Sequence, residues 1–204
     1  MEMSRDIAKE LLDIKAVQIQ TDEYFTWTSG IKSPIYCDNR LIMSYPKTRR
    51  KIAKAFARII AGLEQKPDII AGCATAGIPH AAWLAEEMDL PMVYVRSKPK
   101  GHGKGNQIEG ALQKGQNVVV IEDLISTGGS SIDSARALQQ AGANVLGVLA
   151  IFTYGLKKSK QQFSEATLDF QTITTYEEML AVLKEIGEIN EEELSELREW
   201  KDSL

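Results

Sequence analysis

Residues 118–131 read V-V-V-I-E-D-L-I-S-T-G-G-S-S. The first four are apolar and β-branched, as in a strand that is buried on both faces of a parallel sheet. Two adjacent carboxylates, Glu122 and Asp123, come near the end of this run, and a loop of hydroxyl-bearing and glycine residues follows them. The order predicts a buried strand that leads through a small polar loop into a helix.

The composition of this loop suits a phosphate group. Gly128 and Gly129 let the backbone approach a ligand closely, and the unpaired N–H groups at the start of the helix attract anions. Glu122 and Asp123 would repel a phosphate, but they suit hydroxyl groups such as those of a ribose. The alternative is an ordinary strand-to-helix turn capped by serine or threonine. The acidic pair directly after the apolar run favours a ribose-phosphate site.

Strand and helix patterns alternate along most of the chain. Apolar residues recur every three or four positions in five segments, which predicts helices at residues 4–16, 48–63, 78–88, 129–141 and 175–186. Short apolar runs predict strands at 68–73, 92–95, 117–123 and 144–154. Asn190 and Glu193 have the spacing of a capping box at the start of a last helix.

Strands separated by helices indicate an α/β fold with a mainly parallel twisted sheet flanked by helices. Such sheets bind ligands beyond the carboxyl ends of their strands, and the loop after Asp123 lies at such an end. We expect a single domain over residues 1–204, because no linker interrupts the pattern. Its core would span about 41–169, and a small hood would combine about 1–40 with 170–204.

A second strand leads into a similar loop. Residues 71–78 read A-G-C-A-T-A-G-I, which is small, uncharged and rich in glycine, and a helical pattern follows. This repeats the order of strand, small loop and helix, so it suits a second anionic group. The alternative is a tight turn that only packs the strand against the helix.

Residues 96–110 form a cationic segment between two predicted strands. In an extended chain alternate residues share a face, and here that face carries Arg96, Lys98, Lys100, His102 and Lys104. Glycines occupy positions 101, 103 and 105 between them. A positive segment of this kind on an acidic protein indicates a small polyanionic ligand, over which it would close as a lid. The alternative is a solvated surface loop.

The overall composition excludes several classes of function. The 204 residues are 44% hydrophobic and 25% charged, with a net charge of −4, which is typical of a globular protein and unfavourable for nucleic-acid or membrane binding. No nucleotide-kinase motif G-x-x-x-x-G-K-[ST] is present. Cys37 and Cys73 have no metal-site spacing, and the first residues lack a signal-peptide core. We therefore expect a cytoplasmic protein with reduced thiols that binds neither nucleic acid nor membrane.

The stretch D-L-I-S-T-G-G-S at 123–130 resembles the phosphoribosyl-pyrophosphate (PRPP) signature of the type I phosphoribosyltransferases. Two other segments resemble the orotate phosphoribosyltransferases within that family. They are the K-x-H pattern of Lys100 and His102, and F-T-W-T-S-G-I-K-S-P-I-Y-C-D at residues 25–38. The resemblance extends from about residue 7 to 186, so it covers most of the chain.

The resemblance implies transfer of the ribose 5-phosphate of PRPP to orotate, giving orotidine 5′-monophosphate and pyrophosphate, in pyrimidine biosynthesis. It implies catalytic roles for Arg96, Lys100, His102 and Asp123. It implies PRPP binding by Arg96, Lys100, His102, Glu122, Asp123, Leu124, Ile125, Ser126, Thr127, Gly128, Gly129 and Ser130, with a pyrophosphate loop at Ala74, Thr75, Ala76 and Gly77. Mg²⁺ would be carried mainly by PRPP, because it prefers oxygen ligands and keeps several waters.

For orotate, the resemblance implies a site formed by Ser126, Lys32, Ile35, Tyr36 and Tyr154. It also implies a homodimer in which the segment 96–110 is shared across the interface. Some relatives have a lysine in place of Thr28 and an arginine near the position of Tyr154, so contacts to the base differ within the family. His80, at the start of a predicted core helix, is expected to be structural.

Two alternatives remain open on the sequence. A phosphoribosyltransferase for a purine or for uracil would have the same PRPP signature, but it would leave the Lys100 and His102 pattern unexplained. A PRPP-sensing transcription regulator would need a basic DNA-binding module, for which residues 1–20 are too short.

Overall fold

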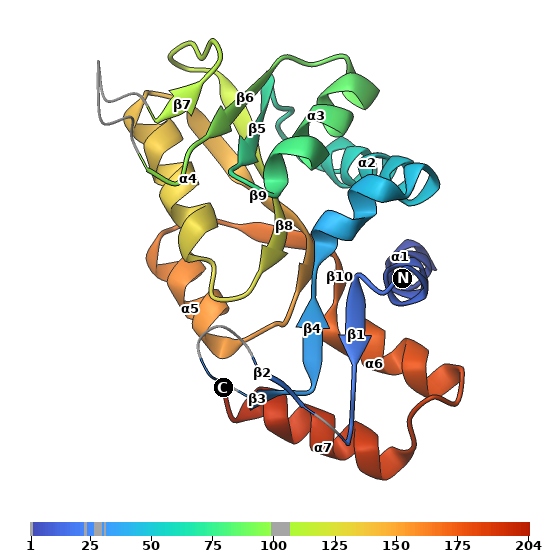
Figure 1. The fold of residues 1–204 in the computed structure, drawn as a ribbon. Helices are drawn as coiled ribbons and strands as arrows, with labels where there is room; N and C mark the ends of the chain where they lie inside the picture. Colours follow the sequence, from blue (N-terminus) through green and yellow to red (C-terminus); the bar gives the residue numbers. More distant parts are fainter. Residues whose placement is uncertain (1, 23, 27–29, 31, 99–106) are drawn as a thin grey trace.

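The computed structural model describes residues 2–22, 24–26, 30, 32–98 and 107–204. A six-stranded sheet forms its centre, with the strand order β10-β9-β8-β5-β6-β7 (Figure 1). The strands are β5 (Ile69–Cys73), β6 (Met92–Val95), β7 (Ile108–Glu109), β8 (Asn117–Ile125), β9 (Asn144–Thr153) and β10 (Phe170–Thr175). All neighbours are parallel except β7, which is antiparallel to β6. The predicted mainly parallel sheet is confirmed.

Strand β8 lies in the middle of the sheet because its side chains are apolar on both faces. It pairs with β5 on one side, where Gly72 lies opposite Ile121, and with β9 on the other, where Leu124 lies opposite Phe152. The side chains of Val118 to Ile121 are all buried. A run of this kind is stable only when helices cover both faces of the sheet.

Helices cover both faces of the sheet (Figure 1). One face packs against α1 (Glu2–Asp13), α2 (Pro46–Ala61), α3 (Gly77–Met88) and α6 (Tyr176–Glu185), and the other against α4 (Gly129–Gln140) and α5 (Lys157–Glu165). Val119 and Ile121 belong to the first core, and Val118 and Val120 belong to the second. This is the alternation of side chains that a strand imposes. Among the described residues, no helix combines the length and apolar character that crossing a bilayer requires.

The hood is built from short elements of both ends of the chain (Figure 1). Strand β1 (Val17–Ile19) pairs antiparallel with β4 (Ile35–Cys37), and β2 (Phe25–Thr26) pairs with β3 (Lys32–Ser33). The last helix, α7 (Glu191–Asp202), begins with the predicted capping box, in which Asn190 and Glu193 bond each other's backbone N–H. Trp200 Nε1 of α7 donates to the carbonyl of Lys32 at 3.1 Å, which joins the two ends.

Helix α5 and strand β10 are among the elements that the sequence pattern did not predict. Helix α5 shows little apolar periodicity, because Phe163 is its one large apolar residue. Only Phe163 and Ser159 of this helix are buried. Strand β10 reads F-Q-T-I-T-T and pairs with β9 in the central sheet, with Phe170 opposite Val148. Residues 170–175, which the sequence analysis grouped with the hood, thus form a strand at one side of the central sheet.

Helix α3 starts very close to strand β8. A Cβ atom on Gly77, the first residue of α3, would lie 2.3 Å from the carbonyl oxygen of Ile121. Real Cβ atoms do not approach backbone oxygens that closely, so a side chain here would push the helix from the strand. Gly129, the first residue of α4, has open space around its Cβ position.

Gly77→Ala is therefore expected to lower the free energy of unfolding by about 1–3 kcal/mol, because the added methyl group forces backbone to shift. Gly129→Ala is the matched control at the same helix position, and its stability should stay within about 0.5 kcal/mol of the parent or rise slightly. Urea denaturation of both variants measures the difference. Equal unfolding midpoints would show that the contact between Gly77 and Ile121 is not tight.

Candidate active site

The predicted loops lie at the end of the sheet that is formed by the carboxyl ends of the parallel strands β5, β6, β8 and β9 (Figure 1). The loop after β5 touches the end of β6, because the N–H of Ala74 donates to the carbonyl of Val95 at 2.9 Å. The start of α3 touches β8 at Ile121 and Glu122. Segments around residues 74, 96 and 122 thus lie together, as expected for the crevice of such a sheet.

Glu122 lies on the side of β8 that faces α4, and its side chain is only 5% exposed. Its Oε1 accepts the N–H of Asp123 at 3.0 Å. Its Oε2 accepts the hydroxyl groups of Ser130 at 3.3 Å and Ser131 at 3.4 Å, in the first turn of α4. The carboxyl group therefore joins the end of the strand to the start of the helix.

Asp123 is held from the hood side of the strand. The side-chain amide of Asn39 donates to the Asp123 carbonyl at 2.8 Å, from the 3₁₀ helix η1 (Asn39–Ser44). Arg40 lies near enough that its charge opposes the rise in the pKa of Asp123, and Arg40 itself pairs with Asp38 at 2.6 Å. The acidic pair is thus fixed by α4 on one side and by η1 on the other.

Burial changes the proton affinity of this pair. It raises the pKa of Glu122 to about 8, and the neighbouring Asp123 carboxylate adds to that rise. Burial raises the pKa of Asp123 as well. It also raises the pKa of the Cys73 thiol beside Glu122 far above its ordinary value. At neutral pH the pair holds at least part of one proton, and Cys73 is an uncharged thiol.

The predicted phosphate loop has the backbone that its sequence suggests. Gly128 has φ +93°, a left-handed conformation that favours glycine, and α4 begins at the next residue. A Cβ on Gly128 would lie 2.6 Å from the ring of Phe163, so the Phe163 side chain of α5 packs directly against the loop. Ser126 and Thr127 are half-buried, and Gly129 and Ser130 are exposed. The N–H groups of the first turn of α4 are therefore available to an anion from solvent.

The predicted pyrophosphate loop follows β5 directly. Thr75 is exposed, Ala74 and Ala76 are half-buried, and Gly77 is buried against β8. The peptide bond between Ala74 and Thr75 is cis. Thr75 is thus the most exposed residue of the predicted pyrophosphate loop.

The base of the cationic segment is closed by two reciprocal contacts. The N–H of Arg96 donates to the carbonyl of Gln107 at 2.9 Å, and the amide of Gln107 donates to the carbonyl of Arg96 at 2.8 Å. The Arg96 guanidinium lies 3.5 Å from the carboxylate of Glu109. Lys100, His102 and Lys104 lie outside the described residues. Arg96 thus stands at the edge of the site, beside the start of the pyrophosphate loop.

The residues predicted for orotate fall into two groups. Tyr36 is 39% exposed, and Tyr154 is buried, with its ring packed edge-on against Phe152. Burial, and then the nearby charges of Cys37, Asp123 and Tyr36, raise the pKa of Tyr154 above its ordinary value, so Tyr154 lies in the neighbourhood of Asp123.

The side chain of Ile35 is fully buried, so only its backbone can face a ligand, and Lys32 is exposed on the outer strand of the hood. Thr28 lies outside the described residues. Leu124 is half-buried, and Ile125 is fully buried, with its carbonyl accepting the Thr153 hydroxyl at 2.9 Å. Ile35 and Ile125 therefore support the site through the backbone rather than through their side chains.

Several contacts of the site were not found from the sequence. Asn39 and Phe163 contact the acidic pair or its loop, yet neither stands in a predicted motif. Cys73 lies inside the predicted loop at 71–78, but its contact with the carbonyl of Ser130 was not expected. The sequence predicts Ser131 as a further hydroxyl donor of the phosphate loop, but it is 1% exposed and its hydroxyl donates to Glu122. His80 is buried, its ring lies edge-on to Trp83 at 5.4 Å, and burial lowers its pKa to about 4, which agrees with the expected structural role.

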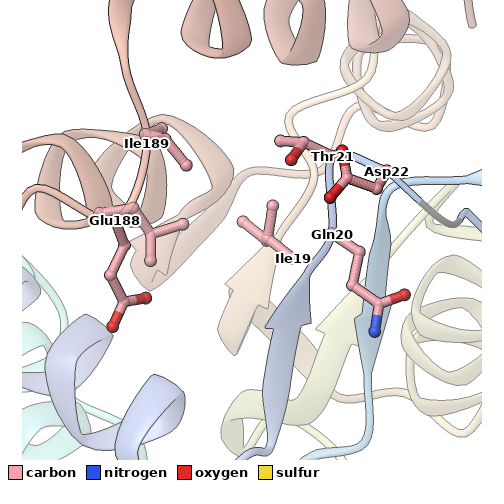
Figure 2. A pocket seen from close by; sticks show the side chains of 7 residues that line it. Ile19, Gln20, Thr21, Asp22, Glu188 and Ile189 are labelled. Atoms are coloured by element: carbon pink, nitrogen blue, oxygen red, sulfur yellow. The ribbon is translucent and has the colours of Figure 1, made fainter.

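A separate hollow of about 360 Å³ lies in the hood, between the end of β1 and the turn before α7 (Figure 2). Among the described residues it is lined by Ile19, Gln20, Thr21, Asp22, Leu183, Glu188 and Ile189. The described lining contains two carboxylates and no lysine or arginine, so it does not suit a phosphate. None of the predicted site residues that the structure describes lines it.

Comparison with known proteins agrees with this geometry. The phosphoribosyl transferase domain family matches residues 41–182, a range that holds the acidic pair, both small loops and the cationic segment. An orotate phosphoribosyltransferase of Oceanobacillus iheyensis is 63% identical over 202 residues, which cover 99% of this chain and 100% of that protein. One of Staphylococcus haemolyticus is 55% identical over 202 residues, with the same coverage.

A solved structure shares the fold over most of the chain. The orotate phosphoribosyltransferase of Aeropyrum pernix superposes with a TM-score of 0.76 at 28% identity, over 90% of this chain and 99% of that one. The domain match, the full-length identity and the shared sheet agree with the strand that ends in an acidic pair. The chain therefore belongs to the phosphoribosyltransferase family, in the group of the orotate phosphoribosyltransferases.

Proposed function

We propose that this protein transfers the ribose 5-phosphate of PRPP to orotate, giving orotidine 5′-monophosphate and pyrophosphate in the synthesis of pyrimidine nucleotides. The observation that carries the proposal is the buried acidic pair of β8 beside the open N-terminus of α4. The pyrophosphate loop and the base of the cationic segment lie at the same end of the sheet. Relatives that match over their full length are orotate phosphoribosyltransferases, which favours orotate over another base.

The reaction exchanges one bond at the anomeric carbon of the ribose. The bond to the pyrophosphate oxygen breaks, the bond to N1 of orotate forms, and N1 gives up its proton. Positive charge develops on the ribose ring and negative charge on pyrophosphate. The protein therefore needs acceptors at the sugar and cations at the leaving group, both held in place before the reaction.

The ribose 5-phosphate half of PRPP fits the end of β8. The 5-phosphate would bind the N–H groups at the start of α4 and the hydroxyls of Ser126, Thr127 and Ser130. Glu122 and Asp123 would accept hydrogen bonds from the ribose hydroxyls. Because the Glu122 carboxyl group is already held by the N–H of Asp123 and the hydroxyl of Ser131, it needs little reorganisation when the sugar binds.

The pyrophosphate half fits the neighbouring loops. Backbone groups of residues 74–77 would bind it, and Arg96, Lys100 and His102 would neutralise the charge that develops as it leaves. Arg96 is placed at the base of the cationic segment, next to Ala74 through the end of β6. The segment would close over the ligand and exclude water.

Mg²⁺ would accompany PRPP in this site. Within the described residues no three histidine, cysteine, aspartate or glutamate side chains gather as they would around a metal ion. An arrangement in which Mg²⁺ takes its ligands mainly from PRPP oxygens and water fits the preferences of this ion. Bound in that way, it would neutralise charge on the pyrophosphate.

Orotate would lie between the hood and the acidic pair. The exposed ring of Tyr36 and the backbone around Lys32 and Ile35 would face the flat base, with Tyr154 and Ser126 completing its surroundings. The nearness of Tyr154 to Asp123 supports this placement, since the base must reach the anomeric carbon.

A homodimer that shares the segment 96–110 across its interface also belongs to the proposal, as does a cytoplasmic location. Three large apolar side chains are 40–43% exposed and close together in sequence. They are Leu41 and Met43 in η1 and Tyr45 directly after it. Exposed apolar groups of this kind are common at interfaces between copies of a chain.

With PRPP and Mg²⁺, the purified protein is expected to convert orotate, because the site combines a sugar-phosphate cradle with a hood suited to a flat base. The ultraviolet absorbance change of orotate on ribosylation measures the reaction. Uracil, adenine and hypoxanthine serve as competing bases. Turnover of one of these bases without turnover of orotate would assign the protein to another branch of the family.

Lys100→Ala is expected to lower kcat by roughly 10²–10³, because one charge directed at the leaving group is lost. Binding of orotate should change much less. Lys54→Ala, which removes an exposed lysine from α2, is the matched control and should leave kcat unchanged. An unchanged kcat for Lys100→Ala would refute its role at the leaving group.

The proton on Glu122 has a consequence for stability. The groups that face this carboxyl are Asp123, Cys73, Ser130 and Ser131. Its folded-state pKa of about 8 lies above the unfolded value of 4.5, so the protonated carboxyl stabilises the fold fully below pH 4.5. This stabilisation is lost as the pH rises through about 8.

The free energy of unfolding of the parent should therefore fall, relative to Glu122→Gln, by on the order of a few kcal/mol between pH 4.5 and pH 8. Glutamine cannot ionise, so the variant lacks this dependence. Urea denaturation across that range provides the measurement, with Glu64→Gln at an exposed position as the control. Parallel pH profiles for the parent and Glu122→Gln would contradict the raised pKa.

A further inference from the structure

Two hydroxyl groups of α4 bond the same oxygen of Glu122, but they differ in access to solvent. Ser130 is exposed, and Ser131 is 1% exposed. Both donate to Oε2, at 3.3 Å and 3.4 Å. Only Ser130 can therefore reach a ligand, while Ser131 can act on a ligand only through Glu122.

Ligand binding puts the two roles of Ser130 in conflict. In the proposed function its hydroxyl serves the 5-phosphate, but in the free protein the same proton is given to Glu122. A serine hydroxyl has one proton, so it cannot donate to both acceptors. Binding of the phosphate therefore removes one of the two donors from Oε2 and frees that oxygen for a ribose hydroxyl.

The carboxyl group must still be held at that moment. Ser131 keeps its bond to Oε2, because no ligand atom can reach its buried hydroxyl. The N–H of Asp123 keeps Oε1. A carboxyl group fixed at both oxygens stays aimed at the sugar, whereas one fixed only at Oε1 could rotate about its last bond.

We propose that Ser131 is a positioning residue, which holds the Glu122 carboxyl group toward the ribose once the 5-phosphate has taken the hydroxyl of Ser130. The inference rests on the proposed function, since it needs PRPP as the ligand. It assigns a role to a buried hydroxyl that touches neither substrate.

Ser134 offers a matched control on the same helix. It is also buried, and its hydroxyl lies 3.1 Å from the thiol of Cys73, with no bond to Glu122 among the described contacts. Ser131→Ala and Ser134→Ala each remove one buried hydroxyl from α4 and leave the backbone of the phosphate loop unchanged. Thermal unfolding of both variants checks that they are folded.

The experiment uses calorimetry to measure the affinity of the whole protein for two ligands. One is PRPP with Mg²⁺, and the other is inorganic phosphate, which is measured by its displacement of PRPP. Ser131→Ala should weaken PRPP binding roughly tenfold, as expected for loss of one long hydrogen bond to a carboxyl group. Its affinity for inorganic phosphate should stay within about twofold, because phosphate uses the start of α4 and not Glu122. Ser134→Ala should change neither affinity by more than about twofold.

The outcomes separate the inference from the proposed function. PRPP binding by the parent with equal affinities for Ser131→Ala and Ser134→Ala would overturn the positioning role alone. Equal weakening of PRPP and inorganic phosphate by Ser131→Ala would also overturn it, since it would show a damaged phosphate loop. Failure of the folded parent to bind PRPP would overturn the proposed function, and this inference with it.

Discussion

The carboxyl group of Glu122 is buried where β8 ends and α4 begins, and the site depends on how its polar atoms are satisfied. A buried carboxyl without partners costs several kcal/mol, but this one accepts the N–H of Asp123 and the hydroxyls of Ser130 and Ser131. Those bonds set the distance between the acidic pair and the open N–H groups of the helix. In the proposed function, the same spacing would let one sugar phosphate engage both.

The rest of the structure supports this strand end from several directions. Gly77 brings α3 against Ile121, Asn39 of η1 binds the carbonyl of Asp123, and Phe163 of α5 underlies Gly128. These three contacts come from segments far apart in the chain. Together they hold the acidic pair, the phosphate loop and the pyrophosphate loop near one another at the carboxyl ends of the parallel strands, where such sheets bind ligands.

Local patterns in the sequence were sufficient for most of the fold. The apolar run at 118–121 predicted a fully buried strand, and the periodicity at 48–63 predicted the helix observed as Pro46–Ala61. Helix α5 was missed because its sequence K-K-S-K-Q-Q-F-S-E buries so little apolar surface. Strand β10 was missed because its threonines are ambiguous until β9 lies beside it.

The sequence by itself determined the type of sheet, the acidic pair, the glycine-rich loop and the cationic segment, because each is carried by residues adjacent in the chain. Only the tertiary structure decided which side of β8 each carboxyl faces and which groups hold it. Cys73, Asn39 and Ser131 meet the pair through sheet pairing and helix packing. Contacts of that kind depend on distances between segments, and they leave no local pattern in the amino-acid order.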